Sequence, residues 1–222
     1  MKTSHLVLSA LAAFAVAACG SDSNAANPTA AEGDVAVPGT ALGDMYLGEE
    51  DAPVTIIEYA SITCPHCAEF HENVFPTIQE RIDAGDVKFI FREYPTPPQD
   101  IALAGFAIAR CAGEDKYFEA LDDFFSNQDK LIQAARTGSV GEYLKATGAR
   151  HGVDEREFQA CTRDDTLYQA MIEIIEGGAA MGVSATPTLF LNGEKMGREG
   201  QTAEGMNAAI DTALGIEPAE AE

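Results

Sequence analysis

Two cysteines separated by two residues, Cys64 and Cys67, are the side chains of this sequence best suited to covalent chemistry. A pair spaced in this way can be half of a zinc site, a structural disulfide, or a redox pair that exchanges disulfides with other thiols. A zinc site needs two further ligands, and the other cysteines and histidines are scattered with no second close-spaced pair. Haem attachment requires a histidine directly after the second cysteine, where Ala68 stands. These observations favour the redox pair, and we expect no metal and no dissociable cofactor.

Cys64 lies where an apolar, β-branched run ends and a helical pattern begins. A sulfur at this junction faces unpaired backbone N–H groups and the positive end of the helix dipole. Both favour the thiolate, and such sites lower a cysteine pKa from about 8.5 into a range of roughly 3.5–7.5. We therefore expect Cys64 to be the nucleophile and Cys67, one turn inside the helix, to be its partner.

Three neighbours of this pair are further candidates for a role in catalysis. Pro65 suits the first helical turn, where its missing N–H costs nothing. His66 adds a donor, or a positive charge when protonated, beside the thiolate. Glu58 lies inside the apolar run, where a buried carboxyl is costly unless protonated or paired, so it suggests a proton acceptor for a buried Cys67. The alternatives are a surface histidine and a strand-edge glutamate exposed to water.

The elements that must position these residues follow from hydrophobic periodicity. Residues 54–59, 87–91 and 187–191 read as strands, and Asn192-Gly193 as a hairpin turn leading to another short strand. Helical spacing marks residues 66–84, a series of helices over 99–178, and 203–214, while Pro76 should kink or split the first helix. Within the series, Ser139 could cap one helix, and Asp154 with Glu157 three residues later resembles a capping box at the start of another. Strands alternating with helices predict an α/β fold in which helices cover a central sheet.

The N-terminal residues read as a targeting segment. Lys2 precedes an apolar run that is too short to span a bilayer stably, and small residues follow, as in a secretory signal. The ending Val16-Ala17-Ala18-Cys19 resembles a bacterial lipobox. We therefore interpret residues 1–18 as a lipoprotein signal peptide, Cys19 as the lipidation site, residues 19–43 as a flexible tether and 217–222 as an acidic tail. The alternative is an ordinary cleaved signal with an incidental cysteine.

Export also bears on Cys111 and Cys161, which fall on predicted helices. In a compartment that permits disulfides, we expect these two cysteines to be joined as a structural disulfide. Buried free thiols are the alternative.

Charge and composition exclude one class of function. The 222 residues include 14 Lys and Arg against 36 Asp and Glu, a formal net charge of −22. Such a surface repels phosphate backbones, so we expect no nucleic-acid partner. A hydrophobic fraction of 46% supplies a sizeable core for one domain with an insertion, which we expect to be a monomer.

The run from Glu58 to Cys67, which ends in Cys-Pro-His-Cys, resembles the DsbA-like family of bacterial periplasmic oxidoreductases. The later run from Ala185 to Phe190 is similar to the cis-proline loop that faces the redox pair in that family. The resemblance spans residues 46–214. It implies a thioredoxin-like fold, a central mixed β-sheet flanked by helices with an inserted α-helical subdomain. Residues 44–98 and 179–216 would form the two parts of the thioredoxin-like domain, and residues 99–178 the insertion.

The resemblance also implies a substrate site. A cis bond before Pro187 would present the backbone of Thr186 to an extended substrate. Thr186 differs from the valine of the best-known oxidases and is found in related isomerase-like members, which leaves the direction of electron flow open.

The function implied is that of a thiol:disulfide oxidase that introduces disulfides into exported proteins with free thiols. Cys64 would form the mixed disulfide and Cys67 would resolve it. By family analogy a quinone-linked membrane protein would reoxidise the pair, and lipid on Cys19 would anchor the chain at the periplasmic face of the envelope. The alternatives are a reductase or isomerase of the same fold, and a non-enzymatic envelope lipoprotein with a structural Cys64–Cys67 bridge.

Overall fold

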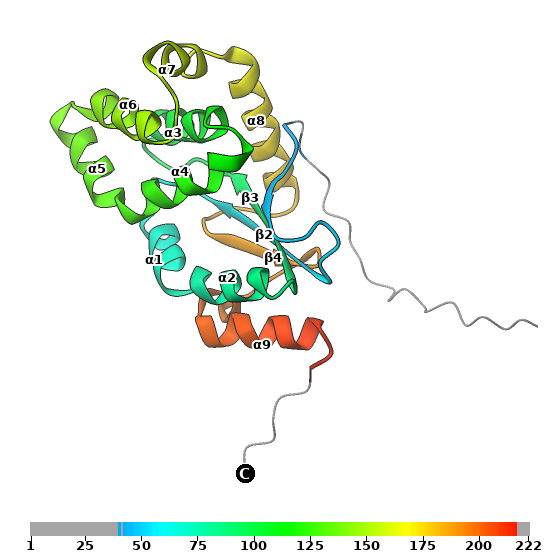
Figure 1. The fold of residues 1–222 in the computed structure, drawn as a ribbon. Helices are drawn as coiled ribbons and strands as arrows, with labels where there is room; N and C mark the ends of the chain where they lie inside the picture. Colours follow the sequence, from blue (N-terminus) through cyan, green and yellow to red (C-terminus); the bar gives the residue numbers. More distant parts are fainter. Residues whose placement is uncertain (1–39, 41, 217–222) are drawn as a thin grey trace, which may run out of the picture. The chain divides into compact units, whose positions relative to one another are not determined.

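A mixed five-stranded sheet lies at the centre of the computed structural model, which describes residue 40 and residues 42–216 (Figure 1). The predicted signal peptide, Cys19, most of the tether and the acidic tail lie outside the described residues. Only the central pair is parallel, and the other neighbours are antiparallel. The strands, in their order across the sheet, are β1 (Met45–Leu47), β3 (Val87–Glu93), β2 (Val54–Ala60), β4 (Thr188–Leu191) and β5 (Glu194–Lys195). The predicted mixed sheet is confirmed, although β1 was not predicted because three residues are too few to show an alternating pattern.

The central strand β2 leads directly to the segment that contains Cys64 and Cys67. Six of its seven residues are buried, as expected for a strand covered by helices on both faces, which reads as a nearly continuous apolar run. Glu58 lies opposite Phe91 of β3 on one side and Leu189 of β4 on the other. A carboxyl group is therefore placed in the middle of the sheet rather than at its edge.

The connection from β2 to β3 is a helix broken in two. α1 (Pro65–Asn73) and α2 (Phe75–Asp83) meet at Val74. Pro76 stands in the first turn of α2, where its ring would clash with the carbonyl of the preceding turn if one helix continued. The predicted split is thus confirmed, and it leaves α1 as a short helix that begins directly after Cys64.

Between β3 and β4 the chain consists of helices, as predicted. Figure 1 shows α3 to α7 gathered together, with α8 returning beside the sheet. Their bounds are α3 (Gln99–Cys111), α4 (Glu114–Ser126), α5 (Gln128–Thr137), α6 (Val140–Arg150), α7 (Glu155–Cys161) and α8 (Asp165–Ala180). Within the described ranges, no helix has both the length and the apolar character needed to cross a bilayer.

Two predicted helix caps have different outcomes. Asp154 and Glu157 form the expected capping box at α7, each side chain accepting a hydrogen bond from the other's backbone N–H at 2.8 Å. Ser139 occupies the N-cap position of α6, but its side chain makes no capping bond and its hydroxyl lies 3.0 Å from that of Thr137. The expectation for Ser139 was wrong because its ψ of 13° departs from the extended backbone that usually aims an N-cap side chain at the helix.

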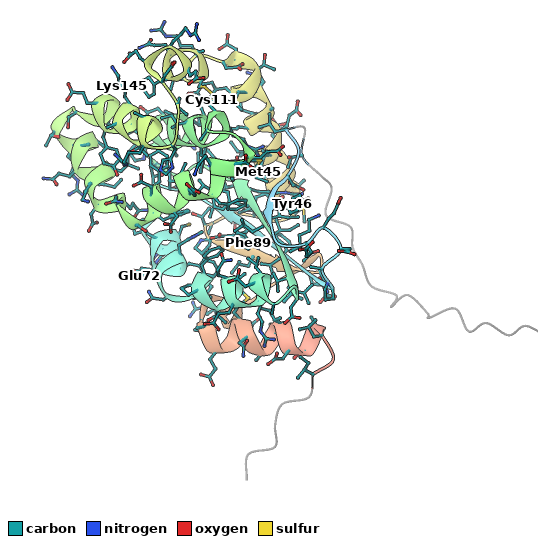
Figure 2. All side chains as sticks on the ribbon, viewed as in Figure 1. Met45, Tyr46, Glu72, Phe89, Cys111 and Lys145 are labelled. Atoms are coloured by element: carbon teal, nitrogen blue, oxygen red, sulfur yellow. A yellow bond between two sulfur atoms is a disulfide. The ribbon has the colours of Figure 1, made fainter. Side chains whose placement is uncertain are left out.

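A buried charge pair ties the helices to the sheet. The Glu93 carboxylate at the end of β3 is fully buried and accepts two hydrogen bonds from Arg110 of α3, at 2.6 and 3.0 Å. The hydroxyl of Tyr117 on α4 donates a third at 2.7 Å. A buried charge is tolerated when its hydrogen-bonding capacity is filled in this way. Figure 2 shows the side chains that fill the space between the sheet and the helices, Phe89 among them.

The chain after the helices returns to the sheet as a hairpin. Asn192 and Gly193 both have positive φ, 46° and 83°, which fits the predicted two-residue turn between β4 and β5. A 3-10 turn, η1 (Arg198–Gln201), leads to α9 (Ala203–Ala213), which packs on α2. There Arg81 of α2 donates hydrogen bonds to Asn207 and Asp211 of α9. This contact closes the second part of the sheet domain onto the first.

Candidate active site

The two cysteines lie at the N-terminus of α1 as free thiols, not joined in a disulfide. Cys64 is the N-cap residue, in an extended conformation with φ −91° and ψ 118°, and Pro65 follows at the start of the helix. Cys67 is fully buried and Cys64 is 7% exposed. The structure therefore brings together one sulfur at the rim and one in the interior, in the predicted arrangement.

The pKa of the Cys64 thiol is lowered to about 5. The largest cause is a hydrogen bond from the Cys67 thiol, which stabilises the Cys64 thiolate; the side chain of Thr186 and the backbone amides of Cys67 and His66 add to it. Burial opposes this effect by disfavouring the charged form. The hydrogen bonds outweigh the effect of burial, so Cys64 is a thiolate at neutral pH.

The pKa of the Cys67 thiol is raised far above its usual value. Burial is the main cause, followed by the hydrogen bond that the thiol gives to Cys64 and by the negative charge of Glu58. The backbone N–H of Ser61 lies 3.5 Å from the sulfur and opposes the shift weakly. Cys67 thus keeps its proton while Cys64 has lost its own.

The Thr186–Pro187 loop faces the first cysteine, and its peptide bond is cis. When protonated, the thiol of Cys64 donates to the carbonyl of Thr186 at 3.4 Å. A hollow of about 190 Å³ adjoins this loop. It is lined by His66, Glu69, Phe70, Asn73, Val74, Pro187 and Gln201. The structure therefore brings together residues that are more than 120 positions apart in the sequence.

The His66 imidazole does not lie on the sulfur. Its side chain is 78% exposed, and its Nδ1 lies 3.3 Å from the carboxylate of Glu69. Glu69 is three residues later on the same helix, so it offers the ring an acceptor on its own face. The contribution of His66 to the Cys64 thiolate comes from its backbone amide, whereas the sequence suggested the side chain.

The Glu58 carboxyl is completely buried in β2, in agreement with the buried interpretation rather than the strand-edge alternative. One oxygen, Oε2, lies 2.9 Å from Nε2 of His71, and the other, Oε1, has no hydrogen-bond partner. The sequence motifs do not mark His71 as part of the site. A signal was available, because His71 follows Cys67 by four residues and must share its helix face.

Gln128 is a second residue of the site that the sequence did not reveal. It lies at the start of α5 and is buried, and its Nε2 donates to the carbonyls of Ile62 and Cys64, both at 2.9 Å. These two bonds tie the helical insertion to the loop that carries the nucleophile. No local pattern marks the residue, because its partners are at least 64 positions away in the sequence.

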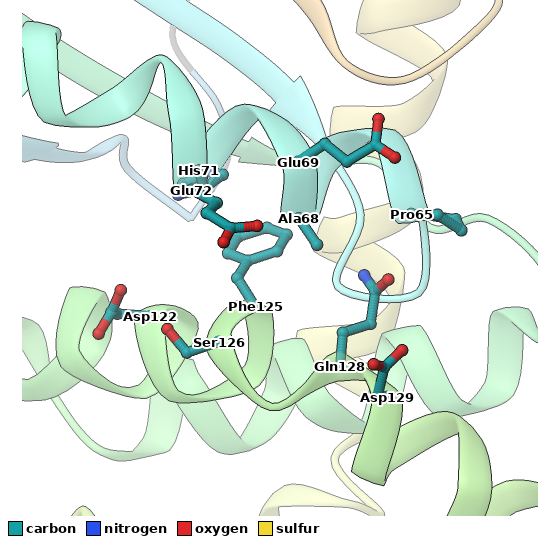
Figure 3. Close-up of a pocket in the computed structure, with 10 residues that line it drawn as sticks. All are labelled: Pro65, Ala68, Glu69, His71, Glu72, Asp122, Phe125, Ser126, Gln128 and Asp129. Atoms are coloured by element: carbon teal, nitrogen blue, oxygen red, sulfur yellow. The ribbon is translucent and has the colours of Figure 1, made fainter.

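A groove of about 480 Å³ separates α1 from α4 and the start of α5, and we call it the α1–α4 groove (Figure 3). Figure 3 shows the ring of Phe125 pointing across it toward His71. The groove is strongly acidic. Its lining residues are Pro65, Ala68, Glu69, His71, Glu72, Asp122, Phe125, Ser126, Gln128 and Asp129.

The remaining two cysteines of the described residues form a disulfide. The sulfurs of Cys111 and Cys161 are 2.01 Å apart and the Cα atoms 6.3 Å apart, which joins the C-terminal ends of α3 and α7. This pair lies in the helical insertion, as the sequence suggested. In the part of the chain that the structure describes, no group of three or more His, Cys, Asp or Glu side chains is arranged to hold a metal ion.

This chain is similar to known proteins in three respects, a family model, a curated relative and a solved structure. The thioredoxin family model matches residues 40–212. Disulfide bond formation protein D of Bacillus subtilis is 30% identical over 179 residues, which are 72% of this chain and 74% of that protein. A variant of α-DsbA1 from Wolbachia pipientis has a similar structure, with a TM-score of 0.68, 26% identity, and coverage of 78% of this chain and 91% of its own.

Longer relatives also match. A Rickettsia bellii protein whose name describes a protein-disulfide oxidoreductase is 31% identical over 177 residues, 77% of this chain. The match covers 64% of that relative's own length and 60% of its counterpart from Rickettsia conorii. This chain therefore spans about three fifths of the length of these relatives.

Proposed function

Since this chain belongs to the thioredoxin family, in its DsbA-like group of thiol:disulfide oxidoreductases, we propose that it is a disulfide oxidase for exported proteins. The observation that carries the proposal is the contrast between its two thiols. Cys64 at the start of α1 has a pKa of about 5, and Cys67 one turn later has a strongly raised pKa. A structural bridge has no need of such a difference, whereas disulfide exchange depends on it.

The proposed cycle starts from the Cys64–Cys67 disulfide. A substrate thiolate attacks the Cys64 sulfur, the Cys64–Cys67 bond breaks, and Cys67 leaves as a thiolate that takes up a proton. A second substrate thiolate then attacks the substrate sulfur of the mixed disulfide and displaces Cys64. The substrate gains a disulfide and loses two electrons, which remain on the two cysteines. If the second substrate thiol does not attack, Cys67 loses its proton and releases the substrate by re-forming the enzyme disulfide.

The direction of transfer follows from the Cys64 thiolate. Whatever stabilises this thiolate favours the reduced enzyme, and therefore makes the disulfide form a stronger oxidant. The carbonyl of Thr186, beside the sulfur, and the hollow next to Pro187 suit an extended substrate strand that pairs with the cis-proline loop. We include Pro65, His66 and Glu58 in the catalytic group, Glu58 as the acceptor of the Cys67 proton.

The partners of the proposed oxidase are exported proteins with free thiols and a quinone-linked membrane protein that reoxidises the cysteines. The lipobox-like ending at Cys19 supports a lipid anchor at the periplasmic face of the bacterial envelope. Mass spectrometry of the protein from its native membrane tests the anchor. An unmodified Cys19, or cleavage elsewhere, would remove that part of the proposal.

Substitution of each cysteine tests the mechanism. We expect Cys64→Ser to abolish thiol exchange with a peptide that contains a disulfide. In Cys67→Ser, the Cys64 thiolate should attack that disulfide, displace one peptide sulfur as a thiol, and accumulate as a mixed disulfide with the peptide, visible by non-reducing mass spectrometry. The double variant of Cys111 and Cys161 to alanine is the control, and it should retain exchange activity. Full activity in Cys64→Ser would contradict the mechanism.

One observation favours a second candidate, a reductase or isomerase of the same fold. Thr186 places a hydroxyl beside the Cys64 sulfur, where the best-known oxidases of the family carry valine. Titration of the protein at equilibrium in glutathione buffers measures the reduction potential of the Cys64–Cys67 pair. This value distinguishes an oxidase from a reductase or isomerase. A value near the roughly −120 mV of a strong oxidant supports the oxidase, and a value near about −270 mV supports the reductase.

A further inference from the structure

A buried hydrogen bond connects the redox centre with the α1–α4 groove through His71. Nε2 of the His71 imidazole lies 2.9 Å from Oε2 of Glu58. The Glu58 side chain is 0% exposed and the His71 side chain is 10% exposed. Glu58 lies in the interior of the sheet and His71 lines the groove. The pair therefore leads from the inside of the protein to its surface within two side chains.

The position of the imidazole is enforced by aromatic packing. The ring stacks on Phe125 of α4, with centroids 3.9 Å apart and planes at 14°, and on Phe75 of α2, at 5.0 Å and 24°. Phe91 of β3 and Phe70 meet it at larger angles. Nδ1 has no hydrogen-bond partner among the described residues, which leaves it available to water in the groove. Nε2 of His71 is thus held against the buried Glu58 carboxyl, and Nδ1 faces the groove.

The Cys67 thiol requires such a connection. Its sulfur is fully buried, and each turnover changes its protonation, because it leaves one disulfide as a thiolate and later attacks another as a thiolate. Glu58 is close enough for its charge to act on Cys67, and its Oε1 has no hydrogen-bond partner. A carboxylate sealed inside the protein can take one proton from Cys67, but exchange of that proton with the solvent needs a path out of the interior.

We propose that His71 is a positioning and proton-relay residue that holds the Glu58 carboxylate toward Cys67 and carries its proton to and from water in the α1–α4 groove. This inference rests on the proposed function. Before the attack, the Glu58–His71 pair holds two protons, one shared by Oε2 and Nε2 and one on Nδ1. When Cys67 attacks, its proton passes to Oε1 of Glu58, the shared proton stays on Nε2 of His71, and Nδ1 releases its proton to water. When Cys67 leaves a disulfide, the same transfers run in reverse. No net charge remains in the interior.

The charges around the relay are mostly negative. Glu58 faces His71 from β2, and α2 and β3 contribute only the aromatic rings named above. The carboxylates of the groove come from α1, α4 and the start of α5, and are those of Glu69, Glu72, Asp122 and Asp129. A proton that leaves Nδ1 therefore enters a negatively charged groove. A purely structural His71 would instead only satisfy the buried acid, a role that a glutamine amide also fills.

The test is a rapid-mixing experiment that separates the reaction of Cys64 from the reaction of Cys67. Reduced protein is mixed with oxidised glutathione. A first phase, which depends on glutathione concentration, reports attack by Cys64, and a second, concentration-independent phase reports release of glutathione by Cys67. His71→Gln should slow the second phase by about 100-fold, within the range of general acid–base catalysis, and leave the first phase unchanged. The wild-type second phase should also slow in heavy water.

His151→Gln is the matched control. That imidazole lies 2.9 Å from the Asp123 carboxylate and is 12% exposed, so it repeats the pairing of His71 away from the cysteines. The control should leave both phases at their wild-type rates. A second variant, His71→Gly, should lose the second phase and recover it when imidazole is added to the buffer.

Each outcome has a separate meaning. The relay would be overturned if the second phase of His71→Gln kept its wild-type rate across the range of about pH 5–8 in which imidazole titrates. It would also be overturned if both phases slowed equally and added imidazole did not restore the second phase of His71→Gly. If the wild-type protein itself showed neither phase, the proposed function would fail before the relay is tested.

Discussion

The chemistry that we propose for this protein depends, at the residue scale, on two thiols that differ in burial and in hydrogen bonding. Cys64 receives hydrogen bonds at the open end of a helix, and Cys67 supplies one of them from the interior. The same bond that lowers the pKa of Cys64 raises that of Cys67, so the two shifts share a cause. His66, which lies between them in the sequence, faces Glu69 instead of the sulfur.

The thiolate of Cys64 should be visible in a pH titration. With a pKa of about 5, the thiolate absorbance in the ultraviolet of the reduced protein should rise around that pH. Because folding lowers this pKa, stabilisation of the reduced protein relative to Cys64→Ser should be absent below about pH 5, grow between about pH 5 and about 9, and level off above. Urea midpoints at the two ends of this range measure the effect. An equal difference at both ends would contradict the assignment.

Glu69→Gln extends this prediction. The substitution removes a negative charge from α1, five residues after Cys64, and releases the His66 imidazole from its partner. The pKa of Cys64 should therefore fall by a fraction of a unit, and the reduction potential should rise. Asp115→Asn, at the far end of α4 from the groove, is the control and should change neither quantity.

At the scale of elements, two close approaches bring helices of the insertion against β2 and the loop that follows it. Gly105 of α3 lies where a Cβ would come within 2.2 Å of Ile62, in the loop before Cys64. Gly178 of α8 lies where a Cβ would come within 2.8 Å of the ring of Tyr59. Gln128 adds the hydrogen bonds from α5 to the same loop. The helical insertion thus packs against β2 and the loop that precedes Cys64, and supports both.

The adjacent glycines of α8 provide a matched pair of substitutions. Gly178→Ala should destabilise the protein by about 1–3 kcal/mol, because the methyl group overlaps Tyr59 and overpacks the core. Gly177→Ala has no atom within 4 Å of its new methyl group and should stabilise the helix by roughly 0.5–1 kcal/mol. Chemical denaturation of both variants checks the signs, and equal effects would contradict the packing described.

At the scale of the whole molecule, two kinds of contact connect elements that are distant in the chain. Arg110 and Glu93 bury an ion pair between α3 and β3, and Arg81 links α2 to α9. The disulfide between Cys111 and Cys161 closes a segment with a sequence separation of 50. None of these residues is among the groups that shift the pKa of Cys64 or Cys67.

Removal of the structural disulfide should cost stability and spare the chemistry. In the Cys111→Ala, Cys161→Ala double variant we expect a loss of about 2–4 kcal/mol, since the bridge restricts the unfolded chain. The pKa of Cys64 should stay at about 5, because neither of the bridged cysteines is among the groups that lower it. A lost thiolate signal in a folded double variant would contradict this separation of roles.

The sequence by itself determined the placement of Cys64 and Cys67 at the start of a helix, the order of strands and helices, the split at Pro76 and the α7 capping box. These features are local, because each depends on residues within a few positions of one another. The DsbA-like resemblance supplied the cis-proline loop and the helical insertion. The short β1 and the helix face shared by Cys67 and His71 were also within reach of local reasoning, but their signals are weak.

Only the tertiary structure decided which distant side chains meet. Gln128 reaches the carbonyls of Ile62 and Cys64 because α5 packs on the active-site loop, and nothing within α5 indicates that contact. The surroundings of Glu58 were equally hidden, because a glutamate in an apolar strand is buried or exposed according to whether the strand is central or at an edge. Strand order is set by how the whole chain buries its apolar surface, and it is this order that encloses Glu58 and gives it His71 as a partner.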